Sequence, residues 1–142
     1  MGHYIETFRG AIYPWHCDHQ DHLTAMHYVG MFDQAFWQHT SALGFSRAYL
    51  EEHRKGFVDV QDTLTYLVEL NVGGLVVIDS GLLKVGNTSM TVLHRMRNSD
   101  TGELAATSEK ISVFFDVEKR TKLPFPDGMR QKMNDMLVTR ET

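Results

Sequence analysis

Cysteine and long apolar runs are scarce in this chain, and each scarcity excludes a class of protein. The single cysteine, Cys17, has no second thiol in the chain with which to form a disulfide. The longest apolar run, Leu75 to Ile78, is far shorter than the roughly 20 residues that cross a bilayer. The first residues also lack the basic and apolar regions of a signal peptide. We therefore expect a cytoplasmic protein with no membrane partner.

An excess of positive charge is also missing. The chain has 14 Lys and Arg against 18 Asp and Glu, which gives a formal net charge of -4. Because the chain has no net positive charge that would attract a polyanion, we expect no nucleic acid partner. The 142 residues, 42% of them hydrophobic, have the size and apolar content of one globular domain spanning residues 1–142.

The spacing of apolar residues predicts a strand, a long helix and then four more strands. Helical spacing predicts a helix from Thr24 to Leu43, with Thr24 as its N-cap. The other predicted elements are strands at 4–15, 58–70, 75–85, 90–97 and 104–117, a short helix or loop at 47–55 and a helix-compatible tail at 127–137. This order is typical of an α+β domain in which one antiparallel sheet wraps against the helix.

The predicted helix has apolar side chains nearly all round its axis. We therefore expect it to be buried on most sides, with the sheet curled about it and with His27 and His39 at its surface or at an interface. In the last predicted strand, Ile111, Val113 and Phe115 share one face, and Ser108, Lys110 and Ser112 lie mostly on the other.

The segment from His16 to His22 is the densest group of titratable side chains, and three hypotheses fit it. A metal site is the first, because His and Asp bind zinc and nonheme iron, although no second His or Cys cluster follows to complete the ligands. A solvated loop that caps the helix is the second. The third is a catalytic carboxylate beside a helix N-terminus, whose free N–H groups stabilise a developing oxyanion.

The stretch from Trp15 to Tyr28, followed by Met31-Phe32-Asp33, resembles the signature of hotdog-fold acyl-CoA thioesterases of the 4-hydroxybenzoyl-CoA thioesterase type. The segments 66–73, 113–116 and 123–126 resemble later strands and turns of the same family. The chain departs from the family where Asp21 replaces a Gly and where Thr24 and Ala25 replace paired Asn residues. Asp is among the residues that tolerate the positive φ which Gly adopts easily.

The resemblance implies a hotdog fold and an enzyme that hydrolyses an acyl-CoA thioester without a cofactor. Asp18 matches the catalytic Asp, acting as nucleophile or as general base on water. A backbone N–H near Ala25 is expected to polarise the thioester carbonyl, and His22 is expected to orient the loop or to act in catalysis.

The predicted substrate contacts come from aromatic residues and from carboxylates in apolar surroundings. Residues predicted to bind the acyl group are Trp15, Met26, Tyr28, Asp33 and Asp62, of which Tyr28 and Asp33 match family positions. Asp33 is also expected to need a partner, either at a subunit interface or in the site, because an unpaired buried charge is costly. Residues predicted to bind the CoA phosphates are Lys84, Arg95 and Arg97.

An apolar edge and face of the wrapped sheet predict at least a homodimer, either a dimer or a tetramer, with a shared site. Two alternatives stay open beside the thioesterase, namely a noncatalytic hotdog protein that binds an acyl thioester and a hydratase or dehydratase on the same fold. The sequence does not choose between CoA and acyl carrier protein.

Overall fold

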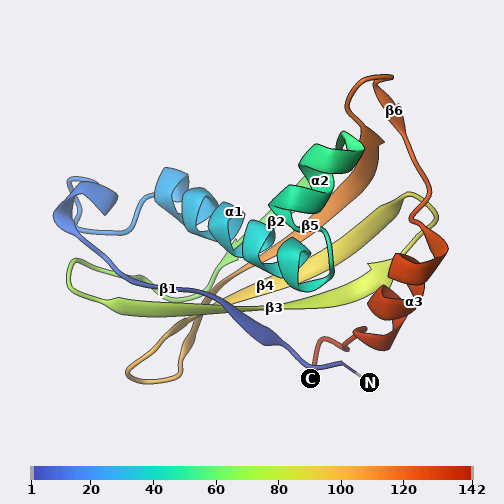
Figure 1. Ribbon diagram of the computed structural model, residues 1–142. Helices are drawn as coiled ribbons and strands as arrows, with labels where there is room; N and C mark the ends of the chain where they lie inside the picture. Colours follow the sequence, from blue (N-terminus) through green and yellow to red (C-terminus); the bar gives the residue numbers. More distant parts are fainter. Residues whose placement is uncertain (1, 142) are drawn as a thin grey trace.

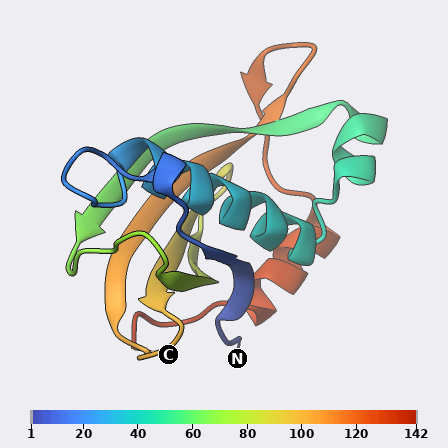
Figure 2. The same ribbon diagram turned by 90° about the vertical axis from the view of Figure 1, so that its left-hand side faces the viewer.

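Residues 2–141, which the computed structural model describes, form one curved antiparallel sheet with a long helix lying across it (Figure 1). The elements are β1 (Ile5–Ala11), η1 (Pro14–His16), α1 (Ala25–Ala42), α2 (Arg47–His53), β2 (Lys55–Tyr66), β3 (Leu75–Val85), β4 (Ser89–Asn98), β5 (Leu104–Asp116), β6 (Thr121–Lys122) and α3 (Asp127–Asp135). The strand order is β1-β3-β4-β5-β2, with β6 paired to β5. The predicted α+β class, with a sheet curled about one helix, is confirmed (Figure 2). None of the helices in this part of the chain is long and apolar enough to span a membrane.

The first strand is shorter than predicted. It ends at Ala11, and residues 14–16 form a 3-10 turn that begins at Pro14. Proline has no N–H for the sheet ladder, while its fixed φ suits the first position of a helical turn. The prediction that the strand reached Pro14 or Trp15 is therefore wrong, and the chain turns toward α1 before these residues.

Strand β2 also differs from its prediction, because a bulge interrupts its alternation. The register with β5 shifts between Asp59 and Gln61, so Asp59 and Asp62, three residues apart, both lie on the inner face. Strand β2 pairs only with β5 and is the edge of the sheet. The strand ends at Tyr66 rather than at 70, and residues 67–74 cross from this edge to β3 beside β1.

Helix α1 is buried on one side only. Its inner side packs Tyr28, Phe32 and Phe36 against the sheet, while Met26 and Trp37 on the outer side are 71% and 45% exposed. The prediction of burial on most sides is therefore wrong for a single chain. His39 is also buried within the single chain, contrary to its prediction as a surface or interface residue. The Thr24 side chain donates to His16 O instead of capping the helix.

The core consists of two apolar clusters separated by polar side chains. One cluster surrounds Phe32 and the other surrounds Phe36 and Phe114. Between them a row of buried polar residues, here called the polar belt, crosses the inner face of the sheet: Thr7, Ser80, His94, Ser108 and Lys110. The polar face of β5 therefore points inward, and its apolar residues Ile111, Val113 and Phe115 lie on the outer face.

Candidate active site

The loop before α1 holds the carboxylate of Asp18 in a defined place. Its Oδ1 accepts backbone N–H bonds from Gln20 at 2.8 Å and from His22 at 3.2 Å. These two bonds are the main causes that lower the pKa of Asp18 below its ordinary value. The carboxylate is thus ionised at neutral pH, and within residues 2–141 no hydrogen bond engages its Oδ2.

The crossing segment 67–74 fixes this loop from outside. Leu23 N donates to Leu70 O at 2.8 Å, and Asn71 Nδ2 donates to Asp21 O at 2.7 Å. His22 Nε2 lies 3.1 Å from Glu69 Oε2, so the imidazole has an acidic partner on the crossing segment. Asp21 has φ 64, and its carbonyl is the group that Asn71 holds.

The start of α1 supplies backbone donors beside this loop. The Thr24 carbonyl accepts from His27 N and Tyr28 N, and Thr24 gives no side-chain cap to the helix. The N–H groups of Ala25 and Met26 therefore have no partner among residues 2–141. The helix dipole adds a partial positive charge at the same place.

Asp18, His22 and Ala25 line a common cleft of about 380 Å³. The other residues around it are Leu23, Tyr28, Tyr66, Leu67, Val68, Glu69 and Leu70. The rings of Tyr28 and Tyr66 meet edge to face at a centroid distance of 5.0 Å. Burial raises the pKa of Tyr28, so its hydroxyl is neutral. The cleft combines an ionised carboxylate, free helix N–H groups and an aromatic wall.

The family model of the thioesterase-like superfamily matches residues 12–133. The chain belongs to this superfamily. No protein of curated function matches the chain in sequence.

Solved structures show that the thioesterase-like chain has the hotdog fold that the sequence predicted. A protein from Staphylococcus aureus, determined in complex with CoA, is 17% identical over 96% of this chain and 85% of its own, with a TM-score of 0.87. A 1,4-dihydroxy-2-naphthoyl-CoA thioesterase from Synechocystis is 12% identical over 91% and 95%, with a TM-score of 0.77. YbaW, a probable thioesterase from Escherichia coli, is 20% identical over 92% and 98%, with a TM-score of 0.78.

The residues predicted to bind substrate fall into three places in this thioesterase-like fold. Tyr28 lines the cleft, whereas Trp15 and Met26 do not. Trp15 is 68% exposed and stacks on Tyr13 at a centroid distance of 4.6 Å. Asp33 and Asp62 lie beyond the cleft, where α1 faces the inner side of β2.

The three residues predicted to bind CoA phosphates lie on the outer face of the sheet, away from α1. Arg95 is paired with both oxygens of Asp79 at 2.8 Å and lies over the Tyr4 ring. Arg97 donates to Gly102 O, and Lys84 pairs with Thr91 across the strands. The structure therefore does not bring Lys84, Arg95 or Arg97 to the cleft of its own chain.

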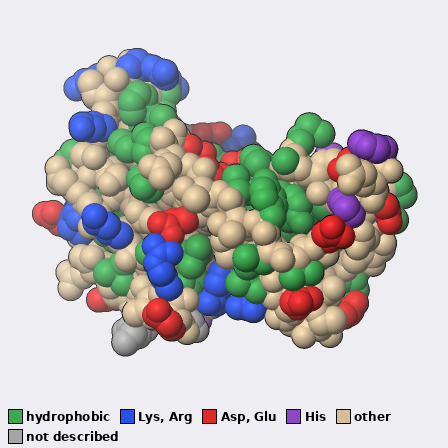
Figure 3. Space-filling view, turned by 180° about the vertical axis from the view of Figure 1, so that it is seen from behind, with side chains coloured by type: hydrophobic (Ala, Val, Ile, Leu, Met, Phe, Trp, Pro, Cys, Tyr) green, Lys and Arg blue, Asp and Glu red, His purple; other side chains and the backbone are tan. Residues whose placement is uncertain are grey.

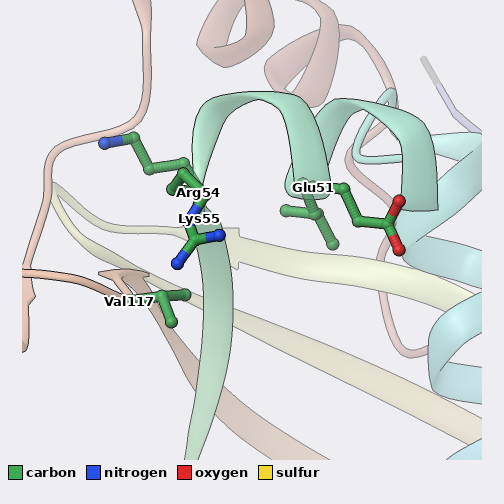
Figure 4. A pocket seen from close by; sticks show the side chains of 5 residues that line it. Glu51, Arg54, Lys55 and Val117 are labelled. Carbon is green, nitrogen blue, oxygen red and sulfur yellow. The ribbon is translucent and has the colours of Figure 1, made fainter.

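A basic group of side chains lies at the other end of the molecule instead. Figure 3 shows Lys and Arg gathered on the projection formed by α2 and the β5–β6 hairpin. Its members are Arg54, Lys55, Lys119, Arg120 and Lys122, and we call them the basic end. A larger cleft of about 540 Å³ lies here, with Arg54 and Lys55 next to Val117 (Figure 4). Its carboxylate, Glu51, lies in the second half of α2 and not at a helix start.

Sequence reasoning missed the residues that position the loop. Glu69 and Asn71 lie about 50 residues after Asp18, and only the fold brings them to it. Asp18, His22, Ala25 and Tyr28 were predicted from one contiguous segment, and the structure brings all four to the same cleft. Among residues 2–141, no three His, Cys, Asp or Glu side chains gather as ligands for a metal ion.

Proposed function

We propose that this protein hydrolyses an acyl-CoA thioester, with Asp18 as nucleophile or as general base on water. The observation that carries the proposal is the shared cleft, in which the ionised Asp18 faces the start of α1 and its unpartnered N–H at Ala25. The family and its solved relatives support thioester chemistry, and the CoA complex of the Staphylococcus aureus protein supports CoA as the carrier.

The chemistry follows from the two halves of the cleft. The thioester carbonyl accepts the Ala25 N–H, which stabilises the oxyanion that forms on attack. A single well-placed donor of this kind contributes about 3 to 4 kcal/mol to transition-state stabilisation. The C–S bond breaks and CoA leaves as a thiolate, which takes a proton from solvent or, where Asp18 has acted as base, from the protonated Asp18. Asp18 either attacks the carbonyl carbon and forms an anhydride that water opens, or removes a proton from the attacking water. His22, which pairs with Glu69, keeps the Asp18 loop in position.

We also propose that the working unit contains at least two chains joined along β2. This strand is an unpaired edge with exposed apolar side chains, Val58 and Val60 among them, and the outer side of α1 exposes Met26, Val29 and Trp37 beside it. An antiparallel pair of β2 strands places the Lys55 end of one chain beside the Tyr66 end of the other. The partner's basic end then reaches the cleft, where it receives the CoA phosphates.

An Asp18→Asn variant tests the reaction. Asn keeps an oxygen that accepts the two backbone N–H bonds but cannot act as nucleophile or base. Thiol release from a panel of acyl-CoA esters is expected to fall at least about a thousandfold, roughly 4 kcal/mol of transition-state stabilisation, while acyl-CoA binding persists. Asp100→Asn, in an exposed turn, is the matched control and is expected to keep wild-type turnover.

Two results would contradict the proposal. Wild-type turnover by Asp18→Asn would remove Asp18 from the chemistry. Tight binding of acyl-CoA esters by the wild type with no thiol release from any of them would point to a protein that binds acyl thioesters without cleaving them.

A further inference from the structure

The polar belt is an unusual feature beneath the central helix. Its five side chains, from Thr7 on β1 to Lys110 on β5, are at most 6% exposed, and they separate the two apolar clusters of the core. Buried polar groups are costly unless they are satisfied, and apolar side chains would fill the same space without that cost. The belt ends beside β2, where side chains of α1 meet that strand; we call this line of contact, from Tyr28 and Tyr66 to Phe36 and Phe57, the seam. Tyr28 and Tyr66, at its start, also line the cleft of Asp18.

The hydrogen-bond chain within the belt determines which nitrogen of His94 carries a proton. Thr7 Oγ1 donates its one proton to Ile78 O, so it accepts from Ser80 Oγ at 2.8 Å. Ser80 has then used its own proton and accepts from His94 Nδ1. Burial, with smaller effects of His39 and Lys110, lowers the pKa of His94 well below its ordinary value, so the ring is neutral. Nε2 is left with a lone pair and no donor among residues 2–141.

This bare acceptor points away from the strand that its ring partner occupies. Nδ1 and Nε2 flank one ring carbon and their outward directions differ widely, so with Nδ1 bonded to Ser80 the lone pair of Nε2 is directed away from β3. The next strand on that side is β5, where Ser108 is the cross-strand neighbour of His94. Ser108 in turn donates to Asp62 Oδ1 at 2.6 Å, which carries the belt across to the edge strand.

Carboxylates dominate the end of the belt beside β2. Asp33 on α1 and Asp59 on β2 lie 3.8 Å and 3.4 Å from Lys110 Nζ, and they are 53% and 47% exposed. Asp59 also accepts from Ser112, and Asp62 lies opposite Lys110 in the strand register. Two carboxylates thus lie within ion-pair distance of one buried ammonium, and Asp62, bonded to Ser108 and opposite Lys110 in the register, is a third close by. The three carboxylates and the one ammonium leave a formal excess of two negative charges.

The seam has a defined start and end. It starts at the cleft, where Tyr28 meets Tyr66, and it is closed at its far end by Phe36 against Phe57 at a centroid distance of 6.0 Å. Asp33 lies five residues beyond Tyr28, which is about 7.5 Å along α1. A chain that starts at a thioester carbonyl beside Asp18 therefore brings its far end among the carboxylates.

We propose that the acyl group bears a protonated amine, or another cation with N–H groups, at its far end, and that Asp33, Asp62 and His94 Nε2 recognise it. This inference rests on the proposed thioesterase function and names its substrate class. An ammonium offers three donors and one positive charge, which matches the free lone pair of His94 Nε2, the remaining lone pairs of the carboxylates and their negative excess. A quaternary ammonium offers the charge without donors, and an alkyl end would desolvate the carboxylates without adding a partner for their excess charge.

The test compares acyl-CoA esters of equal length that differ only at the far end: 6-aminohexanoyl, hexanoyl, adipoyl and the trimethylammonium analogue of the first. The wild type is expected to show a kcat/KM for the amino ester at least tenfold above each of the others. In Asp62→Asn, which still accepts from Ser108, the ratio of amino ester to hexanoyl ester is expected to fall at least tenfold. Asp33→Asn is a second variant with the same expectation, and Asp100→Asn, in an exposed turn, is expected to keep the wild-type ratio.

Binding of the same esters to Asp18→Asn, measured by calorimetry, separates the two proposals. If Asp18→Asn binds the amino ester more tightly than the hexanoyl ester, the proposed recognition of the amine is supported even without turnover. Equal affinities for the amino and hexanoyl esters overturn it, even where Asp18-dependent hydrolysis is confirmed. A trimethylammonium ester bound as tightly as the amino ester overturns the role given to N–H donors.

Discussion

Asp21 shows how one backbone angle supports the reactive loop. Its φ of 64 is a left-handed conformation, and the family resemblance placed a Gly at this position. Asp adopts this region more easily than most residues, which is why the loop closes without Gly. The sequence therefore identified the strained residue correctly, although it gave no sign that Asn71 holds the Asp21 carbonyl.

Substitutions at Asp21 test this strain. Asp21→Val places a β-branched residue at positive φ and is expected to lower the free energy of unfolding by about 1 to 2 kcal/mol. The displaced loop is also expected to lower kcat more than it raises KM. Asp21→Gly is the matched control and is expected to keep both properties near wild type. Denaturant unfolding and thiol release measure the pair, and equal behaviour of the two variants would show that the angle is not a constraint.

His39 links the stability of the fold to pH. Burial lowers its pKa from 6.5 to about 4. At a pH between about 4 and 6.5, His39 is therefore mostly neutral in the native chain and mostly protonated in the unfolded chain. Between these two values the unfolded state binds more protons, and the free energy of unfolding therefore falls as the pH falls. The loss from His39 alone reaches about 3 kcal/mol at the lower value.

His39→Leu removes this titration. Denaturant unfolding between pH 6.5 and 4 is expected to show a shallower loss of stability in the variant than in wild type. His94 keeps part of the dependence, because burial lowers its pKa in the same direction. His3→Gln, at an exposed position, is expected to retain the wild-type slope. A variant with the unchanged slope would show that His39 is not the group that titrates.

At the scale of elements, periodicity predicted which segments are helices and strands but not which face of a strand is inward. In β5 the apolar residues Ile111 and Val113 lie outside, while Lys110 and Ser112 are buried under α1. In β2 the bulge after Asp59 moves the inward face from one parity to the other. Both outcomes depend on pairing between strands far apart in the chain, which a single segment does not encode.

The polar belt illustrates the same limit for the site. Asp18, His22 and Tyr28 could be found from one contiguous segment, Asp33 was predicted to need a partner, and Asp62 was predicted to contact the substrate. The partners Lys110 of Asp33 and Ser108 of Asp62, and the chain that leads to His94, come from strands that meet only in the folded sheet. Sequence spacing carries no information on such cross-strand neighbours.

At the scale of the whole molecule, the outer side of α1 and the free edge of β2 both leave apolar side chains exposed in the single chain. A helix with apolar residues nearly all round was expected to be covered on most sides, and the described chain covers only the inner side. In the dimer that we propose, a second copy pairs along β2 and covers this edge together with the flank of α1 next to it. The partner's basic end would then reach the cleft, so assembly and activity are expected to be lost together.

Val60→Lys tests this coupling, because it places a charge on the exposed edge strand, where Val60 is 59% exposed. Light scattering is expected to give wild type a mass of at least twice the 16.3 kDa chain, and to show the variant shifted toward a single chain. Thiol release is expected to fall with the loss of the dimer, mainly through a higher KM, since the CoA phosphates lose the partner's cations. Leu75→Lys, on an exposed residue of β3 away from this edge, is expected to keep both mass and turnover. A wild-type chain that is monomeric and fully active would place the whole CoA site within one copy and would return Lys84, Arg95 and Arg97 to consideration.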